Sequence, residues 1–525
     1  SPSGIETNYE YSADYQHALL TKVTLNKLTD ADSQEKTNVV LKELGYDPLT
    51  YRKRWEKDAR GYVTEFQYDA IGRETLTMLP DDNDPADFRP ANNSGPIDRS
   101  GSRSDNPVQQ VIYKDADRTT TVVDPMGNRT DYIYDSFEHL MEIVKFKKQL
   151  GIFTEYSRVK VRYDNQGNIS QIVSPEGCRN PAKESLYRTE YLYDETNRLS
   201  KIFYPKDNPD ADNPFKFYHY NDVANWVTVT DENLNETIIK KDPVDRVIEQ
   251  VLGSGTAQEV TNKYTYDSLG NKLTETDGKG NVTTFVYDDL NRLIKKILPA
   301  EEMLNNPDGQ TVSESPVYHY QYDAEGNLIK EITPLGTVIT HVYDEMNREI
   351  RTETTFTGLD GTKKNVVTKV FYDLAGNKIK TVDAAGKATE FTYTARGWLK
   401  TQKDAMGGIT SFTYDAVGNK TSETDPRGNA PGAPANSYTA WYYYDELYRI
   451  VKGVLPDDTP PANPDSPGDN PVINFEYDLN GNCVKEIKAN GQEINYTYNG
   501  RNWLLTQSQS LNGVNYTTRF EYDGV

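Results

Sequence analysis

The residues best suited to chemistry are scattered along this 525-residue chain. The histidines are five in number: His17, His139, His219, His319 and His341. None stands at a recognisable spacing from a nucleophile or a second base. His341 occupies a strand position that Phe285 and Phe412 hold in other copies of a repeat, so a sheet-face role explains it better. The sequence predicts that the chain is not an enzyme and has no catalytic residue and no cofactor.

Two acidic clusters offer oxygen ligands of the kind that Ca²⁺ prefers. They read Asp81-Asp82-Asn83-Asp84 and Asp207-Asn208-Pro209-Asp210. Both lack the spaced ligands, the central Gly and the bidentate Glu of a calcium-binding hand. We therefore expect solvated acidic loops and no metal site.

Exposed aromatic residues are the feature most able to bind a ligand. Trp398 and Trp503 each follow a turn, and Trp441 opens the run Trp441-Tyr442-Tyr443-Tyr444. Aromatic rings with Asn and Asp nearby can stack against sugars, which makes Trp398, Trp441 and Trp503 candidate ligand-stacking residues. The alternative is that these rings extend an aromatic ladder or pack beneath an insertion.

The composition limits both the fold and the partners. Apolar residues make up 36% of the chain, and tyrosine supplies 38 residues against 15 Phe and 6 Met. Such a chain favours a sheet one layer deep, sealed by amphipathic rings, over a thick two-layer core. The net charge of −22 argues against nucleic acid and anionic membranes as partners. No apolar stretch approaches the roughly 18 residues of a membrane span, and two cysteines, Cys178 and Cys483, leave the redox compartment open.

A repeat of 21 residues organises the chain. Its clearest copy runs from Tyr266-Asp267 through Gly270-Asn271, Asp277 and Gly280-Asn281 to Tyr287-Asp288. A fixed period in this range indicates supersecondary units that must stack on their neighbours. The predicted structural anchors are Tyr68, Tyr134, Tyr163, Tyr193, Tyr266, Tyr287, Tyr322, Tyr343, Tyr372, Tyr414, Tyr444 and Tyr477.

Each unit contains two turns of one type. Asp at position i and Gly at a left-handed position i+3 are typical of a type I turn, which joins antiparallel strands when a bulge follows. Proline suits position i+1, as in Asp124-Pro125-Met126-Gly127, Ser174-Pro175-Glu176-Gly177 and Asp425-Pro426-Arg427-Gly428. Where Gly is absent, Asn tolerates the positive φ best; such residues are Asn197, Asn291, Asn347 and Asn502.

The strands between these turns alternate with period two. Thr283, Phe285 and Tyr287 share one face, so stacked units place an aromatic column on that face. The pattern does not decide which face looks inward. We expect an all-β repeat array of about twenty stacked antiparallel hairpins, forming a single-layer strip that curves because twisted strands cannot stack flat.

The domain organisation follows from the repeat. We expect a degenerate repeat or lead-in over residues 1–45 and one continuous hairpin array over 46–525. Loop insertions are expected at about 81–107, 206–217, 300–316 and 457–471, all on one edge of the strip. The chain begins at Ser1 and its last unit opens only at Tyr522, so we expect it to be cut from a longer protein.

The Tyr-Asp anchors followed by Gly-Asn or Asn-Arg resemble the YD repeats of the rearrangement-hotspot (RHS) proteins, the bacterial insecticidal toxin complexes and the animal teneurins. The resemblance covers nearly everything from Tyr46 onward and includes 14 Tyr-Asp dipeptides. It implies a strip that spirals into a hollow shell. Toxins of this family also carry a core segment with an Asp-Pro-x-Gly self-cleavage site. Here that motif occurs only at ordinary turns, so no catalytic role carries over.

The resemblance implies a non-enzymatic shell segment that encapsulates and protects a secreted toxin or effector. Its partners would be the polypeptide cargo or neighbouring shell subunits. The alternative is a cell-surface adhesin or a self-associating extracellular fibre of YD repeats. A third hypothesis is carbohydrate binding through the aromatic rows. In each case we expect a bacterial protein that is secreted or lies on the cell surface.

Overall fold

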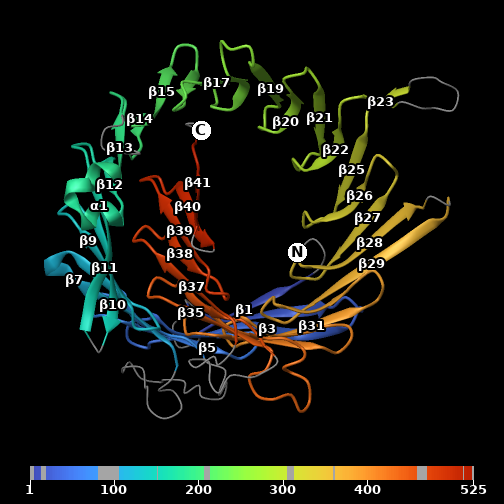
Figure 1. Cartoon of the computed structure of the whole chain (residues 1–525). Helices are drawn as coiled ribbons and strands as arrows, with labels where there is room; N and C mark the ends of the chain where they lie inside the picture. The colour runs from blue at the N-terminus through green and yellow to red at the C-terminus, as the bar shows by residue number, and fades with distance from the viewer. Residues whose placement is uncertain are drawn as a thin grey trace.

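The chain forms one long sheet of antiparallel strands (Figure 1). The structure, a computed structural model, describes residues 5–12, 19–80, 106–149, 152–205, 213–303, 312–358, 361–457, 470–511 and 514–522. Within these residues, 39 strands join a single sheet, and β23 (Glu301–Met303) pairs with β24 (Val312–Glu314) in a separate ribbon. The expected all-β repeat array of stacked hairpins is confirmed.

The first part of the sheet, called the first coil below, comprises β1 to β22. Its strands are β1 (Thr7–Tyr11), β2 (Leu20–Thr29), β3 (Glu35–Tyr46), β4 (Lys53–Asp58), β5 (Val63–Tyr68), β6 (Glu74–Met78), β7 (Val108–Lys114), β8 (Thr119–Val123), β9 (Arg129–Tyr134), β10 (Leu140–Gln149), β11 (Ile152–Tyr163), β12 (Ile169–Val173), β13 (Arg188–Tyr193), β14 (Leu199–Phe203), β15 (Phe215–Asn221), β16 (Trp226–Thr230), β17 (Glu236–Lys241), β18 (Val247–Leu252), β19 (Val260–Tyr266), β20 (Lys272–Thr276), β21 (Val282–Tyr287) and β22 (Leu293–Ile297). Three short helical segments interrupt it: η2 (Asp115–Asp117), α1 (Pro175–Arg179) and η3 (Pro181–Leu186).

The second coil comprises β25 to β41. Its strands are β25 (Val317–Tyr322), β26 (Leu328–Ile332), β27 (Val338–Tyr343), β28 (Glu349–Thr357), β29 (Lys363–Tyr372), β30 (Lys378–Val382), β31 (Ala388–Tyr393), β32 (Leu399–Lys403), β33 (Ile409–Tyr414), β34 (Lys420–Thr424), β35 (Thr439–Tyr444), β36 (Ile450–Val454), β37 (Val472–Tyr477), β38 (Cys483–Ile487), β39 (Glu493–Tyr498), β40 (Leu504–Leu511) and β41 (Val514–Arg519). Each strand pairs with the next along the chain, and β22 pairs directly with β25.

The two turns of a unit lie on opposite edges of the sheet. We call the edge formed by the turns after the anchor tyrosines the Tyr-Asp edge, and the other one the opposite edge. In the opposite-edge turn after Asp277, Gly280 donates its N–H to the Asp277 carbonyl at 2.9 Å and has a φ of 86°. In the Tyr-Asp turn after Asp288, Asn291 takes the same place with a φ of 61°. The type I turns with a left-handed fourth residue are therefore confirmed.

One expected turn is wrong. Ser174-Pro175-Glu176-Gly177 does not form a β-turn but begins α1, with Cys178 N–H bonded to the Ser174 carbonyl at 3.1 Å. Proline at N1 suits a helix start as well as a turn. Gly177 is needed here for close packing, because an added Cβ would lie 2.9 Å from Tyr187 and from Val173.

Register is fixed at the anchor tyrosines. In the hairpin of β21 and β22, Tyr287 pairs with Leu293 and the register shifts between Val286 and Tyr287. A one-residue bulge of this kind bends the strand and increases its twist. The side of β21 that carries Phe285 and Tyr287 is half-buried, whereas Val282 and Val286 on the other side are exposed. The predicted alternation is thus present, and one face of the strip is more covered than the other.

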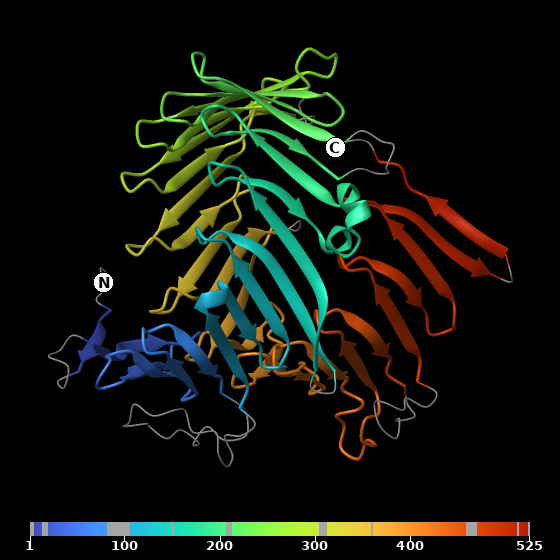
Figure 2. The same ribbon diagram turned by 90° about the vertical axis from the view of Figure 1, so that its left-hand side faces the viewer.

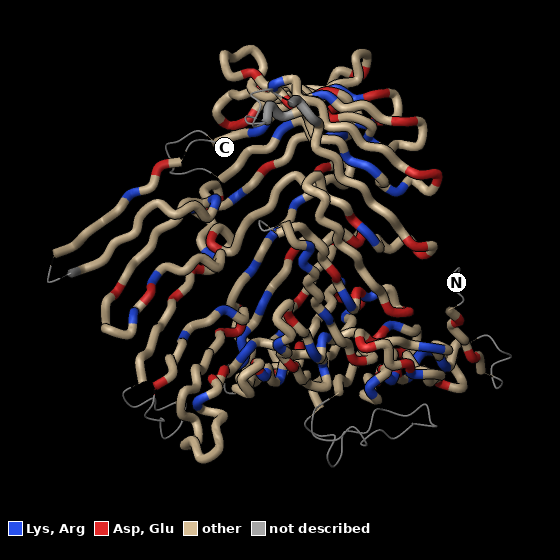
Figure 3. The backbone as a smooth tube through the Cα atoms, turned by 90° about the vertical axis from the view of Figure 1, so that its right-hand side faces the viewer, with Lys and Arg blue, Asp and Glu red and all other residues tan. Residues whose placement is uncertain are grey.

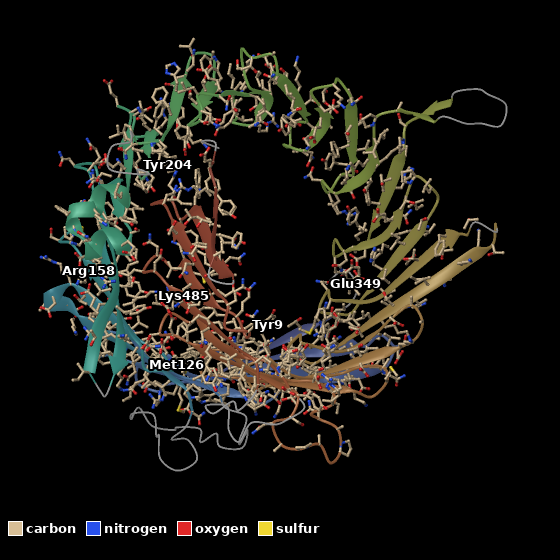
Figure 4. All side chains as sticks on the ribbon, in the orientation of Figure 1. Tyr9, Met126, Arg158, Tyr204, Glu349 and Lys485 are labelled. Atoms are coloured by element: carbon tan, nitrogen blue, oxygen red, sulfur yellow. The ribbon has the colours of Figure 1, made fainter. Side chains whose placement is uncertain are left out.

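The strip winds around a central space (Figure 1). The described side chains line this space in Figure 4 and leave its centre open. After one circuit, the second coil comes to lie beside the first (Figure 2), with the turn after β31 against Arg60 and the turn after β35 against Asp124. Hydrogen bonds between the coils join residues 269 to 337 positions apart in sequence. The contact line between the coils is called the seam below.

The four expected insertions begin on the opposite edge, and a backbone hydrogen bond closes the base of each one. Leu79 and Leu455 each donate their N–H to the carbonyl of a distant proline, at 2.9 Å to Pro107 and 2.8 Å to Pro471. The asparagine before each proline returns a bond at 3.0 Å, from Asn106 to the Leu79 carbonyl and from Asn470 to the Leu455 carbonyl. The sheet therefore continues across an insertion, because β6 pairs with β7 and β36 with β37.

Several expectations fall outside the described residues. These are the acidic clusters at 81–84 and 207–210, His17, and most of the insertions. The strands β1 to β3, which fall in the expected lead-in over 1–45, belong to the same sheet as the later ones. No helix within the described ranges is long and apolar enough to cross a membrane.

Candidate functional site

The anchor tyrosines tie each hairpin to the previous one. The Tyr266 hydroxyl donates to the Val247 carbonyl at 2.8 Å, and the Tyr287 hydroxyl donates to the Lys272 carbonyl at 3.0 Å. In each case the accepting carbonyl belongs to the first residue of the strand that comes before the one ending at the anchor tyrosine. The same bond is made by Tyr46, Tyr163, Tyr193, Tyr220, Tyr322, Tyr343, Tyr372, Tyr393, Tyr414, Tyr444, Tyr477, Tyr498 and Tyr522.

Of the twelve predicted anchors, Tyr68 and Tyr134 make no such hydroxyl bond within the described part of the chain. Both still end a strand before an Asp turn. Tyr68 instead faces a guanidinium, with the Arg52 Cζ 5.9 Å from its ring centroid. The anchor role of the twelve tyrosines remains a proposal, and the recurring hydroxyl bond gives it a physical basis.

The Asp after each anchor holds the turn together. Oδ1 of Asp267 accepts the N–H groups of Leu269 and Asn271 at 2.9 and 2.8 Å. Its Oδ2 accepts the Asn271 side-chain amide at 2.8 Å. The Asn271 side chain, followed by these backbone donors, lowers the pKa of Asp267. At Asp194, the Arg198 backbone N–H and the neighbouring donors lower the pKa to about 2.

The residue five positions after the anchor reaches toward the next anchor. Arg292 donates to the Asp323 carbonyl at 2.7 Å, and its Cζ lies 5.0 Å from the Tyr322 ring centroid. Arg246 makes the same pair of contacts to Asp267 and Tyr266. A charge over an aromatic face adds roughly 0.5–1 kcal/mol at such exposed sites. The sequence analysis noted these residues only as the end of the Gly-Asn or Asn-Arg pattern and did not predict their contacts with the next anchor.

Trp398 and Trp503 occupy that same position, following Thr394 and Asn499 turns. Trp398 lies 5.4 Å from the Tyr414 ring centroid, and Trp503 lies 5.0 Å from that of Tyr522. Trp441 is 8% exposed in β35. Trp398 and Trp503 thus contact tyrosines of the ladder, in agreement with the alternative interpretation, and Trp441 is buried within its strand. Ligand stacking by Trp398, Trp441 and Trp503 stays a prediction.

Polar contacts close the seam between the coils. Thr29 donates its N–H and its hydroxyl to the Glu345 carboxylate, both at 2.6 Å, and Lys369 pairs with Asp32 at 2.6 Å. In most of the seam's polar contacts, the first coil contributes its opposite edge and the second coil contributes its Tyr-Asp edge. Lys369 and Tyr156 instead lie within their strands, β29 and β11. Further contacts join Arg60 to the Thr394 and Ala395 carbonyls, Asp124 and Asn128 to Tyr448, Tyr156 to Arg449, and Arg501 to Glu232.

Apolar turn residues of the second coil also enter the seam. Met346 and Leu374 pack against a cluster of Leu25, Leu28 and Val39 in the first coil. At the next turn along, Ala395 is only 2% exposed. The seam is therefore a packed interface with a small apolar core, joined by polar contacts that are mostly part-buried.

Helix α1 belongs to the seam. Its Glu176 carboxylate accepts the N–H of Leu479 at 3.0 Å, and its own N–H reaches the Asn480 side chain at 3.3 Å. Nearby, Gly500 approaches the first coil so closely that an added Cβ would lie 1.7 Å from the Leu186 carbonyl oxygen. Neither role could be read from the sequence, because the seam partners lie about 300 residues apart.

The histidines and cysteines do not converge on a centre. His139 stacks on Tyr163 at 4.7 Å between ring centroids, and Nδ1 of His341 lies 3.2 Å from Glu349. Cys178 and Cys483 are free thiols, and burial raises the pKa of each. Among the described residues, no group of three His, Cys, Asp or Glu side chains could hold a metal ion. The site of interest is therefore the wound wall itself, with its seam and its two edges.

Comparisons with known proteins agree with this geometry. Residues 249–358 match the Teneurin YD-shell family model, and residues 393–430 match the RHS Repeat model. No curated protein matches the chain. The crystal structure of TcdB2-TccC3-Cdc42 superposes on 99% of this chain with a TM-score of 0.66 at 13% identity. That of TcdB2-TccC3 without its hypervariable C-terminal region superposes on 98% with a TM-score of 0.60, also at 13% identity.

These likenesses concern the fold. The matches cover 29% and 26% of the two solved chains, so this chain spans less than a third of their length. The matched family models and the wound sheet agree with the Tyr-Asp pattern from which the resemblance was drawn. Two segments of the chain therefore match RHS-repeat and YD-shell family models, and the chain as a whole has the fold of the solved TcdB2-TccC3 structures.

Proposed function

We propose that the chain is a wall segment of a shell that encloses and protects a secreted toxin or effector polypeptide, and that its role is structural. The observation that carries this proposal is the seam, because it closes a one-layer strip into a wall around a central space (Figure 2). A strip without a seam would leave its edges open to water and proteases. Support also comes from the YD-shell match and from the toxin-complex members of the family.

The wall has a chemistry that suits containment. Asp and Glu concentrate at the hairpin tips and Lys and Arg along the strands (Figure 3). Cross-strand pairs such as Lys403 with Glu390 at 3.1 Å satisfy the strand charges within the sheet. The net charge of −22 keeps acidic surfaces apart, so the outside of such a shell favours solution over aggregation. Secretion or surface exposure in a bacterium remains part of this proposal.

Protection of a cargo can be tested in the natural protein that contains this chain. Limited proteolysis followed by mass spectrometry should leave a fragment that is degraded rapidly once the shell is denatured. Arg60→Ala, which removes the bonds to the Thr394 and Ala395 carbonyls, should expose that fragment. Lys403→Ala removes an exposed pair away from the seam and serves as the matched control. A cargo fragment digested equally in all three proteins would overturn the proposal.

The adhesin or fibre alternative is favoured by one observation. Strand β1 pairs only with β2 and β41 only with β40 among the described strands, and both are exposed along their lengths. Unpaired edges of this kind can add another strand. A β1 peptide, residues 7–11, that binds the protein and protects the β41 amides from hydrogen exchange would support this reading, and no protection would count against it.

A further inference from the structure

The two coils use the same kind of turn residue in opposite ways. At six turns of the first coil, the second residue after the turn Asp is an exposed apolar side chain. The set comprises Leu49, Ile71, Phe137, Val244, Leu269 and Leu290, which are between 66% and 78% exposed. In the second coil, Met346 holds the same position and lies in the seam, and Leu374 and Ala395, one residue earlier in their turns, enter it as well. The Tyr-Asp edge of the first coil therefore has the form of a seam surface that no described segment of the chain covers.

The chain also presents the complementary surface. In the seam, a Tyr-Asp edge meets an opposite edge, and the opposite edge of the second coil carries apolar tips of its own. Leu335 is 88% exposed and Met406 is 96% exposed at two of these turns, and Ala385 is exposed at a third. In the first coil, the opposite-edge tip Ala31 is buried where the second coil covers it. Both halves of a second seam are thus available on every copy of the chain.

The charges at the open edge do not prevent such contact. The carboxylates of its turns are already satisfied within their own loops, as at Asp267, where both oxygens accept hydrogen bonds. Asp288 is held in the same way by the N–H groups of Leu290 and Arg292 and by the Arg292 side chain. Covering such an edge removes apolar tips from water without stripping bare carboxylates of their partners.

We infer that the Tyr-Asp edge of the first coil docks the opposite edge of the second coil of another copy of this chain. The contact continues the geometry of the seam and extends the wound wall along its axis. Such a contact joins two different surfaces and leaves one of each free at the ends, so it builds open-ended stacks. This inference stands apart from the proposed enclosure of a cargo. It also differs from strand addition at β1 and β41, because it uses turn tips and no ladder bonds.

Sedimentation velocity across a dilution series tests this inference. The unmodified chain should shift from monomer to higher species as its concentration rises. Added salt should strengthen the shift, because it screens repulsion between copies of charge −22. Leu269→Asp with Leu290→Asp should block one surface, and Leu335→Asp with Met406→Asp should block the other. Each double variant alone should remain monomeric, and an equimolar mixture of the two should form only dimers.

The controls separate docking from misfolding and from other occupants. Leu269→Met with Leu290→Met keeps the apolar tips and should assemble as the unmodified chain does. Circular dichroism and thermal midpoints should be unchanged in all variants, because the tips are exposed. An unmodified chain that stays monomeric throughout would overturn the inference. Assembly that survives in both double variants would also overturn it and would assign the association to the strand edges.

Discussion

The Tyr-Asp edges of the two coils differ only in what covers them. Both are built from the same turn, in which an Asp carboxylate holds the loop and an anchor hydroxyl ties it to the preceding hairpin. In the second coil that edge is packed on the first coil through Met346, Leu374 and Ala395, and in the first coil it is exposed. The comparison teaches that the repeat supplies one generic turn, and that winding decides whether its tip acts as core or as surface.

Acid should produce the largest effect, because it acts on many turns of the first coil at once. The Asp267 and Asp288 pKa values are lowered, the first mainly by the Asn271 side chain and the second by the Arg292 backbone N–H, and that of Asp194 is about 2. A carboxyl with a lowered folded-state pKa stabilises the fold above its unfolded pKa of about 3.9 and loses that contribution as pH falls toward the folded pKa.

The urea midpoint should therefore stay flat from neutral pH to about 5 and fall between about pH 4 and 2. Hydrogen exchange should show the turns of Asp194, Asp267 and Asp288 losing protection over the same range. A fall that begins near pH 6 would assign the transition to histidines and contradict this account.

Breaking a seam ion pair should cost far more than breaking one on the open edge. Arg501 and Glu232 pair across the seam with side chains 10% and 12% exposed, whereas Lys241 and Asp245 pair at the open edge of the first coil. Arg501→Ala leaves a mostly buried carboxylate without this partner and should lower the free energy of unfolding by about 3 kcal/mol. Lys241→Ala should lower it by less than about 1 kcal/mol. Equal losses in urea denaturation would break the comparison.

Truncating an apolar turn side chain should also lower the free energy of unfolding more at the seam than at the open edge. The losses should be smaller than for the ion pairs. Leu374 packs on the cluster of Leu25, Leu28 and Val39, and Leu269 occupies a similar turn in the open. Leu374→Ala should cost about 2 kcal/mol because it leaves a gap in a packed interface. Leu269→Ala should stay within about 0.5 kcal/mol of the unmodified chain when measured on the monomer. A reversed order would mean that the seam is not the packed interface described here.

Removing an anchor hydroxyl should give the smallest effect, and an equal one in both coils. Tyr266 donates to the Val247 carbonyl and Tyr414 to the Leu399 carbonyl, each at 2.8 Å. Tyr266→Phe and Tyr414→Phe should each lower the free energy of unfolding by about 1 kcal/mol, the net worth of one hydrogen bond. Losses that differ clearly between the two coils would show that the unit is not the same on both sides of the comparison.

The fold was predictable because its determinants are local. The spacing of Tyr266 and Tyr287, the Asp and Gly of each turn, and the alternation of Phe285 with Val286 are enough to specify a hairpin and its stacking. Asn291 at positive φ follows from the same rule. Some turns depart from it, since Glu138 and Tyr448 also adopt positive φ although their side chains disfavour it. Tyr448 is held there with its hydroxyl bonded to Asp124 across the seam.

The seam was not predictable because its determinants are distant. Nothing near Gly500 in sequence indicates that it approaches the Leu186 carbonyl, and Glu176 was assigned to an ordinary turn. The length of one circuit depends on the curvature summed over many hairpins and on insertions between them. Small differences in twist at each hairpin therefore decide which residues meet.

A zero-length carbodiimide cross-link between Asp32 and Lys369 tests the winding most directly. Their charged atoms lie 2.6 Å apart across the seam, and the local pair of Glu390 and Lys403, 3.1 Å apart within one hairpin, serves as the internal control. Mass spectrometry of the unmodified protein should find both cross-linked peptides, from monomers separated by size. Recovery of the local peptide without the one that joins residues 32 and 369 would contradict the wound, seam-closed wall.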